Sequence, residues 1–291
     1  MYMKPECLVC LANQALRVAR AVKCDEHCTE AIVKLAAKEV AHYDLAQTPP
    51  EAAAVLYPKI SRIVGKEDLY EHKKIESTNK AFEFLDFVYQ KLDEAPCKID
   101  AALRAAVAGN VIDFATEVSF AVEEEIAKVF EADFAIDEKR AFIDRLKSAK
   151  SFMLIGDNVG EHVYDKVLLE VIEEYYPDMD KYYVVRGKPI INDVTATEAA
   201  AVGIDTLAEI VDSGVDTPGF LLKRANEATK ELFEKIDLIL AKGMGNFECM
   251  DGLKNSKVFH LFKVKCSVVS ARVGAPIGSL VCINNANIKE V

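Results

Sequence analysis

Apolar residues along the first half of the chain recur every three or four positions, which is the period of an amphipathic helix. Leu8, Leu11 and Val18 follow this spacing near the start. The pattern predicts helices over residues 5–22, 29–43, 69–92, 99–107, 120–134 and 138–147, another opening at Pro49-Pro50, and a break at Gly109-Asn110. Thr29 is the expected N-cap of the second helix. We therefore predict a helical N-terminal region over residues 1–150.

From residue 151, short apolar runs of strand length alternate with helical patterns, which is typical of a sheet with crossover connections. The expected strands are residues 152–155, 182–185, 190–191, 238–241, 258–264 and 279–283. The expected helices are residues 161–175, 197–202, 205–211, 219–228 and 229–235. The prediction is an α/β protein: a three-layer α/β/α, Rossmann-like sheet domain over residues 151–291, with the helical region added at its N-terminal side.

Composition narrows the functional classes. The chain has 291 residues, of which 51% are hydrophobic and 29% charged, and it lacks the roughly 18 unbroken apolar residues of a membrane span. Its N-terminus has no apolar core of a secretory signal, so the cytoplasm is the expected location and no membrane partner is expected. A net charge of −11 argues against nucleic acid as a partner, because phosphate backbones require a basic surface.

Polar residues follow several of the expected strands, where the carboxyl ends of parallel strands meet at one edge. Asp157-Asn158 comes after the first strand, Arg186 after the second, and Asn192-Asp193 after the short third one. Later strand ends carry Lys242, Gly243, Glu248, Lys263 and Lys265. We expect these groups to converge on one crevice.

Oxygen ligands from Asp157, Asn158 and Asp193 suit a hard or borderline divalent cation such as magnesium or manganese. Such an ion would polarise a phosphoryl oxygen and position an attacking water. Lys242 and Lys263 would then offset the charge of the phosphoryl group. The glycines flanking Met244, Gly243 among them, would let backbone N–H groups approach it.

Simpler structural roles stay open for each group. Asp157-Asn158 could be an ordinary turn or helix cap, and Asn192-Asp193 could cap the helix expected at residue 197. The segment at Lys242-Gly243 could be a flexible turn. The nucleotide-binding glycine motifs and Gly-x-Ser-x-Gly are absent, and the histidines lack metalloprotease spacing. His162 could lie behind the acidic pair, but we expect it to be exposed.

Four of the eight cysteines fall in the first 28 residues: Cys7, Cys10, Cys24 and Cys28. In a cytosolic chain such a cluster suggests a metal or redox site more than a disulfide framework. The other interpretation is that these are buried helix thiols, since Cys7 and Cys10 are one helical turn apart.

These blocks together resemble the damage-control phosphatase family, in its stand-alone prokaryotic or archaeal branch. The resemblance rests on these stretches: Gly156-Asp-Asn-Val-Gly-Glu161 with Asp165, Arg186-Gly-Lys-Pro-Ile-Ile-Asn-Asp-Val-Thr195, Lys242-Gly-Met-Gly-Asn-Phe-Glu248, Leu261-Phe-Lys-Val-Lys265, Gly109-Asn110-Val-Ile-Asp113 and the opening Pro5-Glu-Cys-Leu-Val-Cys10. It spans nearly the whole chain.

The resemblance implies hydrolysis of phosphomonoesters, including sugar phosphates and other damaged or surplus metabolites. It implies a metal held by Asp157, Asn158 and Asp193, with manganese favoured over nickel, cobalt or magnesium. Lys263 takes the place of the phosphate-binding lysine, while the acid that follows that lysine in relatives of the human member has no counterpart here. The resemblance also implies that the substrate is contacted by Asn110, Asp113, Arg186, Lys242, Gly243 and Glu248.

Two other functions are weighed. A methyltransferase using S-adenosylmethionine is suggested by the helix-rich α/β layout, although the glycine-rich loop for that cofactor is missing. A metal- or redox-responsive binding module would use the N-terminal cysteines. Small phosphorylated metabolites are the expected partners, and a homo-oligomer is compatible with the sequence.

Overall fold

A single sheet of seven strands organises the computed structural model, which describes residues 1–111 and 119–289. The strand order is β1-β7-β6-β5-β2-β3-β4, and all neighbouring strands are parallel except β6 and β7. The strands are β1 (Phe134–Asp137), β2 (Ser151–Ile155), β3 (Asp180–Val185), β4 (Glu209–Asp212), β5 (Leu238–Lys242), β6 (Val258–Lys263) and β7 (Leu280–Asn284). The α/β prediction is confirmed.

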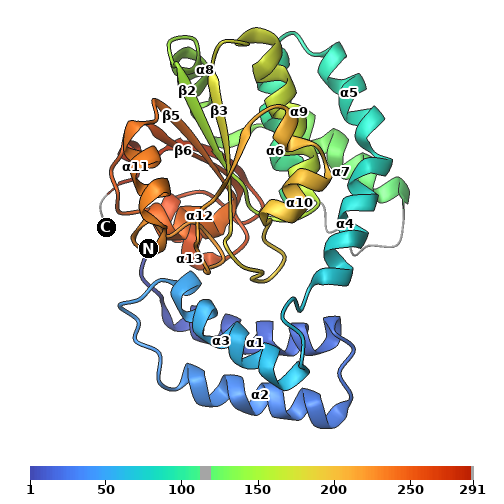
Figure 1. Cartoon of the computed structure of the whole chain (residues 1–291), viewed down its shortest axis with the longest axis vertical. Helices are drawn as coiled ribbons and strands as arrows, with labels where there is room; N and C mark the ends of the chain where they lie inside the picture. The colour runs from blue at the N-terminus through green and yellow to red at the C-terminus, as the bar shows by residue number, and fades with distance from the viewer. Residues whose placement is uncertain (112–118, 290–291) are drawn as a thin grey trace.

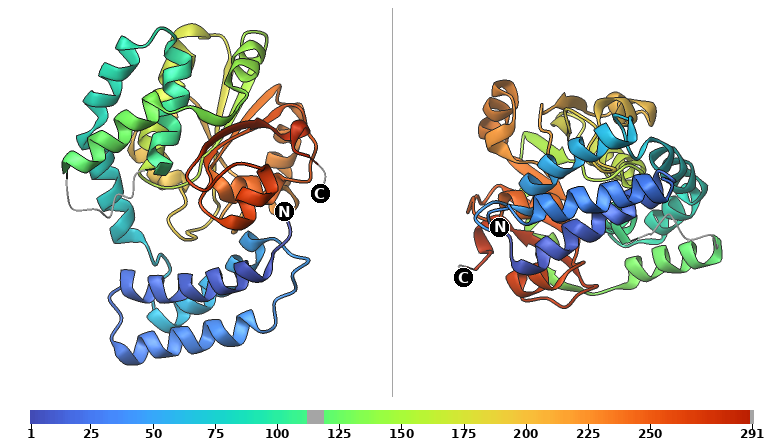
Figure 2. Two further views of the ribbon diagram at one scale, coloured as in Figure 1. Left: turned by 180° about the vertical axis from the view of Figure 1, so that it is seen from behind. Right: turned by 90° about the horizontal axis from the view of Figure 1, so that it is seen from below.

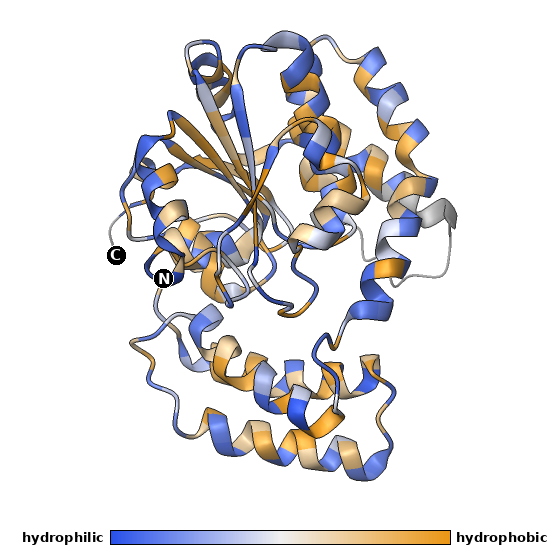
Figure 3. Cartoon of the chain, in the orientation of Figure 1, coloured by the Kyte–Doolittle hydropathy of each residue, from blue (hydrophilic) through white to orange (hydrophobic). Residues whose placement is uncertain are grey.

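Helices cover both faces of this sheet, because side chains alternate between the faces along each buried strand. On β2, Phe152 and Leu154 join a buried cluster with α6 (Lys98–Val111) and α9 (Glu161–Tyr175). Met153 and Ile155 face the other way, toward Phe233 of α11 (Glu227–Lys235). Figure 3 shows the strands as mostly hydrophobic, as expected for a sheet enclosed between two helical layers.

Helices α1 (Pro5–Ala21), α2 (Glu26–Val40) and α3 (Pro49–Val64) lie together at one end of the molecule (Figures 1 and 2). We call them the helical unit. Their buried residues, among them Leu11, Ile32 and Leu56, form a core of their own. By contrast, α4 (Glu71–Glu83), α5 (Leu85–Glu94), α7 (Ser119–Glu131) and α8 (Lys139–Leu146) flank the sheet, whose core includes Val88 and Phe142.

Several predictions for the first half were wrong in detail. Helix α2 starts one turn early, because Asp25 is its N-cap and accepts the Cys28 N–H at 2.8 Å. The expected helix over residues 69–92 is two helices that meet at Phe84. Helix α6 runs through Gly109 without a break. A Cβ on Gly109 would lie 2.8 Å from the Cα of Glu161, so this glycine permits close packing of α6 on α9. Strand β1 replaces the end of the helix expected to reach Phe134.

In the second half, residues 190–191 are in a turn, with Ile191 at φ 41°, and not in a strand. The helix expected over 205–211 is a 3₁₀ turn (Ile204–Thr206) followed by β4, and that over 219–228 reduces to a 3₁₀ turn (Leu222–Arg224) before α11. Helix α10 (Ala196–Ala201) begins at a capping box between Thr195 and Glu198. Helices α12 (Gly243–Met250) and α13 (Ser267–Val273), and the 3₁₀ turn Asn285–Asn287, complete the described chain.

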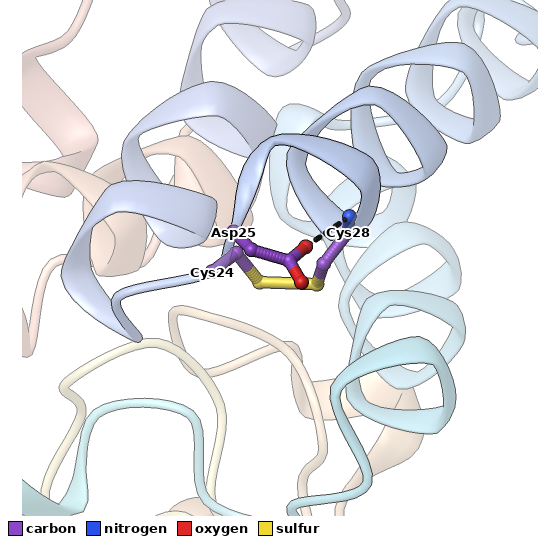
Figure 4. Close-up of a disulfide and its surroundings, with 3 residues drawn as sticks. All are labelled: Cys24, Asp25 and Cys28. Carbon is purple, nitrogen blue, oxygen red and sulfur yellow. Dashed lines mark hydrogen bonds between the residues drawn. A yellow bond between two sulfur atoms is a disulfide. The ribbon is translucent and has the colours of Figure 1, made fainter.

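A disulfide joins Cys24 and Cys28 at the connection between α1 and α2 (Figure 4). The disulfide argues against a metal at these two cysteines, while the redox role stays a prediction, because a disulfide is the oxidised form of a thiol pair. Cys7 and Cys10 are free thiols on α1, the first buried and the second exposed. Within residues 1–111 and 119–289, no helix has both the length and the apolar composition needed to cross a membrane.

Candidate active site

The candidate site lies where β2 and β5 sit side by side in the sheet. From β2 the chain continues to β3 on one side, and from β5 it continues to β6 on the other. Ligands in open α/β sheets bind at such a switch point, outside the carboxyl ends of the strands. Asp157 follows β2, and α12 begins directly after β5 at Gly243. A Cβ on Gly243, at φ 78°, would lie only 1.8 Å from Oδ2 of Asp157. Glycine is therefore required here for the carboxylate to sit against the start of α12.

Backbone hydrogen bonds join the segment that carries Asp193 to the segment that follows β2. The Val194 N–H donates to the Asp157 carbonyl at 2.9 Å, and the Val159 N–H donates to the Asn192 carbonyl at 2.8 Å. Asn158 and Asp193 thereby form an isolated antiparallel bridge. The structure thus brings together the three predicted metal ligands, Asp157, Asn158 and Asp193, and all three line one pocket.

The carboxylate of Asp193 is held on one side only. Its Oδ2 accepts from Nε of Arg186 at 2.7 Å and from the Gly219 N–H at 3.2 Å. Its Oδ1 is buried and has no hydrogen-bond partner among the described residues, although the side chain is only 1% exposed. A buried carboxylate oxygen left unsatisfied destabilises a fold, so this atom points to a ligand that completes the site.

The amide of Asn158 is oriented by two carboxylates. Its Nδ2 donates to Oδ2 of Asp157 at 2.9 Å and to Oε1 of Glu161 at 2.8 Å. A cation would be bound by the amide oxygen, since the nitrogen is engaged with these acids. Two carboxylates and one amide oxygen form the donor set that hard or borderline divalent ions prefer.

The electrostatics of these acids fit the same ligand. Burial raises the pKa of Asp157 well above its usual range, and the negative charges of Glu161 and Asp193 raise it further. Burial also raises the pKa of Asp193 to about 6, although Arg186 opposes the shift. Closely spaced buried acids resist ionising together, and a bound cation would reverse that preference.

The pocket in front of these residues has a volume of about 540 Å³ and lies between the sheet edge and the helical unit. Met244, Gly245 and Glu248 of α12 line it on the sheet side, and so does Lys265. Burial raises the pKa of Glu248 to about 7. The partly exposed Lys263 ends β6 and is not among the lining residues. The structure therefore places Lys265, and not Lys263, in the pocket with Asp157.

Two further predicted site residues lie behind the pocket wall. Arg186 is 1% exposed and binds Asp193 and, through Nη2, the Asn246 side chain at 3.0 Å. Lys242 is fully buried, with Nζ 2.7 Å from Oδ1 of Asp165 and 3.5 Å from Oε2 of Glu161. Burial lowers the pKa of Lys242, but these acids outweigh burial and leave the pKa raised. Both cations hold site carboxylates in place from behind.

The remaining predicted residues divide into two groups. Asn110 is on α6 but its side chain is outside the described part of the structure, as is the whole of Asp113. His162 was expected to be exposed, and this was wrong because α9 buries it completely. Its Nδ1 accepts the Gly160 N–H at 3.0 Å, and desolvation lowers its pKa to about 4. His162 is thus a neutral residue of the protein interior.

Sequence reasoning did not identify the residues that form the second wall of the pocket, which comes from the helical unit. Its lining residues include Cys7, Cys10, Gln14 and Arg17 of α1. The spacing of these polar and sulfur residues at 7, 10, 14 and 17 places them on one helix face, and that regularity was the available signal. Among the described residues, no three or more His, Cys, Asp or Glu side chains are arranged to bind a metal. The predicted site has only two such side chains, because its third ligand is the amide of Asn158.

Comparisons with known proteins agree with this geometry. Residues 3–281 match the model of the damage-control phosphatase ARMT1-like domain. A damage-control phosphatase from Pyrococcus horikoshii is 32% identical over 287 residues, covering 98% of this chain and 99% of that protein. A damage-control phosphatase from Archaeoglobus fulgidus is 26% identical, covering 97% and 98%. The crystal structure of a DUF89 family protein from Pyrococcus horikoshii superposes with a TM-score of 0.91 at 32% identity, covering 98% of this chain and 99% of that one. The chain therefore belongs to the ARMT1-like damage-control phosphatase family.

Proposed function

We propose that this phosphatase is metal-dependent and hydrolyses phosphomonoesters of small metabolites, sugar phosphates included. Asp157, Asn158 and Asp193 would hold the divalent cation, manganese by preference, with nickel, cobalt and magnesium as alternatives. The observation that carries this proposal is Oδ1 of Asp193, a buried carboxylate oxygen without a partner among the described residues, in a pocket shared with Asp157 and Asn158.

When bound, the cation would supply Lewis-acid polarisation of the phosphoryl group. The protein's own groups bind and orient the ester. Lys265 lies near enough to Asp157 to lower its pKa, and its ammonium would offset phosphoryl charge at the pocket wall. The first turn of α12 lies at the same wall, where the helix dipole favours an anion.

Residues behind the wall keep the ligands in place. Arg186 fixes one oxygen of Asp193 and so directs the other toward the pocket. Glu161 orients the Asn158 amide, and Lys242 neutralises Glu161 and Asp165 beneath it. Because all of these groups are buried, their geometry is fixed before a substrate binds, which is the condition for electrostatic catalysis.

The test is phosphate release from p-nitrophenyl phosphate and a panel of sugar phosphates. Protein treated with a chelator should be inactive, and manganese, nickel, cobalt or magnesium should restore activity. Asp193→Asn keeps the shape but removes the charge, and should lose metal-restored activity. Asp178→Asn, an exposed acid in the loop before β3, is the matched control and should behave as the wild type. Activity that survives both chelation and Asp157→Ala would contradict metal dependence.

A further inference from the structure

The helical unit supplies the pocket with a wall whose polar groups are unused by the chemistry above. From α1, Gln14 and Arg17 line the pocket, and from α3 and the segment after it come Tyr57 and Tyr70. None of these four is a predicted metal ligand. All four line the same pocket as Asp157 and Asp193.

Three of these residues form a hydrogen-bonded set. The Tyr57 hydroxyl lies 3.3 Å from Oε1 of Gln14, and it also shares a hydrogen bond with the Tyr70 hydroxyl. Tyr57 is only 4% exposed. Gln14, Tyr57 and Tyr70 line the same pocket as Asp157 and Asp193, so this set shares the pocket with the predicted metal ligands. Hydroxyl and amide groups held in this way suit the hydroxyls of a polyol.

Arg17 extends the set with a positive charge. Burial raises the pKa of Tyr70, and the nearby guanidinium of Arg17 lowers it in part. Arg104, Arg186 and Arg272 each pair with a carboxylate. Arg17 forms no ion pair with any residue that the structure describes, and its side chain is exposed at the pocket. An unpaired guanidinium at the wall of a pocket is a ready partner for a carboxylate or phosphate.

The distance along α1 sets the size of ligand that reaches both ends. Cys10 and Arg17 both line the pocket from α1. Arg17 lies two turns further on, about 10 Å at 1.5 Å per residue. An extended six-carbon chain is about 6 Å long, and the anionic groups at its two ends bring the whole molecule to about 10 Å.

The thiols on the same wall offer a weaker candidate. Cys7 and Cys266 lie close enough to influence one another, but burial raises the pKa of both. A raised pKa keeps them as thiols, which are poor nucleophiles and poor metal ligands. They form a neutral stretch of wall between α1 and α13.

We propose that Arg17, together with Tyr57, Tyr70 and Gln14, binds the end of the substrate remote from the phosphoryl group. The preferred substrates are then polyhydroxylated phosphomonoesters of about six carbons that carry a second anionic group. This inference rests on the proposed phosphatase function and specifies its substrate class.

A matched pair of esters tests the inference. 6-Phosphogluconate and glucitol 6-phosphate differ only at C1, which is a carboxylate in the first and a hydroxymethyl group in the second. With manganese, the wild type should favour 6-phosphogluconate in kcat/KM, mainly through KM. Arg17→Gln should remove this preference by lowering kcat/KM for 6-phosphogluconate about 10-fold or more, the usual loss for one charge-assisted hydrogen bond. Hydrolysis of p-nitrophenyl phosphate, which has no distal anion, should be unchanged in Arg17→Gln.

The control is Arg20→Gln, since Arg20 is on the same helix, exposed, and not among the lining residues of the pocket. It should keep the wild-type preference, and Arg17→Lys should keep part of it. An equal effect of Arg17→Gln on both esters, no effect on either, or a wild type that hydrolyses p-nitrophenyl phosphate but neither ester would each overturn the inference. A wild type that hydrolyses none of the three with any metal would instead refute the proposed function.

Discussion

The two walls of the pocket are built in different ways. At the sheet edge, Asp157 and Asp193 are 7% and 1% exposed and are fixed by backbone pairing, by Arg186 and by the absence of a side chain at Gly243. On the helical wall, Arg17 is exposed and unpaired with any described residue. Buried, over-determined groups suit a reaction centre, while an accessible cation on a separate core suits selection among substrates. The sheet-edge wall therefore suits the chemistry, and the helical wall suits substrate specificity.

Gly243→Ala should produce the largest effect, because it fills the space that the Asp157 carboxylate occupies. A misplacement of about 1 Å can reduce a rate 100-fold, so activity should fall at least about that much. Metal-restored hydrolysis of p-nitrophenyl phosphate measures the loss. The control is Gly252→Ala, where an added Cβ meets nothing within 4 Å. Equal activity of the two variants would show that the tight contact at Gly243 is irrelevant.

Lys242→Met should destabilise the sheet wall itself. The change leaves the buried carboxylates of Asp165 and Glu161 without their cation. Breaking a buried ion pair from one side lowers the free energy of unfolding by about 3–5 kcal/mol. Denaturant unfolding measures this, with exposed Lys235→Met as the control. A loss below about 1 kcal/mol would mean that Lys242 is not a structural cation.

Two buried histidines should each contribute a loss of stability in acid, opposite in sign to the contributions of the buried acids Asp193 and Glu248. Desolvation lowers the pKa of His162 to about 4 and that of His260 to about 3, both below the unfolded value of about 6.5. Between these values only the unfolded chain binds the proton. The contribution of each histidine is therefore complete above about pH 6.5 and falls by about 1.4 kcal/mol per pH unit as the pH drops toward the folded pKa.

Unfolding free energies at pH 7 and pH 5 measure this slope. His260→Gln keeps a hydrogen-bonding group but cannot titrate. Between pH 7 and pH 5 it should therefore lose less free energy of unfolding than the wild type does, or gain more. An unchanged slope would mean that His260 is not buried as a neutral group. The exposed His27 is the control, and His27→Gln should leave the slope unaltered.

Loss of the Cys24–Cys28 disulfide should have the smallest effect. The bond closes a loop of only a few residues, so chain-entropy reasoning limits its contribution to about 2 kcal/mol. Cys24→Ser with Cys28→Ser should lower the melting temperature slightly and leave hydrolysis of p-nitrophenyl phosphate unchanged. A large loss of activity would connect this turn of the helical unit to the reaction centre.

The sequence predicted the sheet-edge wall because topology dictates it. Buried strands are recognisable from apolar runs, and parallel strands bring the residues that follow them to one edge, so Asp157 and Asn158 could be placed there in advance. Asp193 was grouped with them through a strand expected at residues 190–191, which is absent, and its backbone bridge to Asn158 is what brings it to the site. The break predicted at Gly109 was wrong because the role of this glycine depends on tertiary packing. Only the packing of α6 on α9 shows that the glycine admits Glu161 and does not end a helix.

The second wall and the choice of lysine depended on tertiary contacts. Lys263 and Lys265 are two residues apart, and which one reaches the pocket depends on where β6 ends and how the chain turns toward α13. Gln14 and Tyr57 are 43 positions apart and meet only because α1 and α3 pack together. Strands β1 and β4 were missed because they are the two edge strands, whose exposed positions leave no continuous apolar run.

Manganese binding to the chelator-treated protein tests the central claim most directly. Calorimetry of the wild type should show one ion per chain, and Asp193→Asn should reduce its affinity by at least about 10-fold, while Asp178→Asn should bind like the wild type. This readout does not depend on finding the natural substrate. Equal manganese affinity in the wild type and in Asp193→Asn would contradict a metal site at Asp157, Asn158 and Asp193.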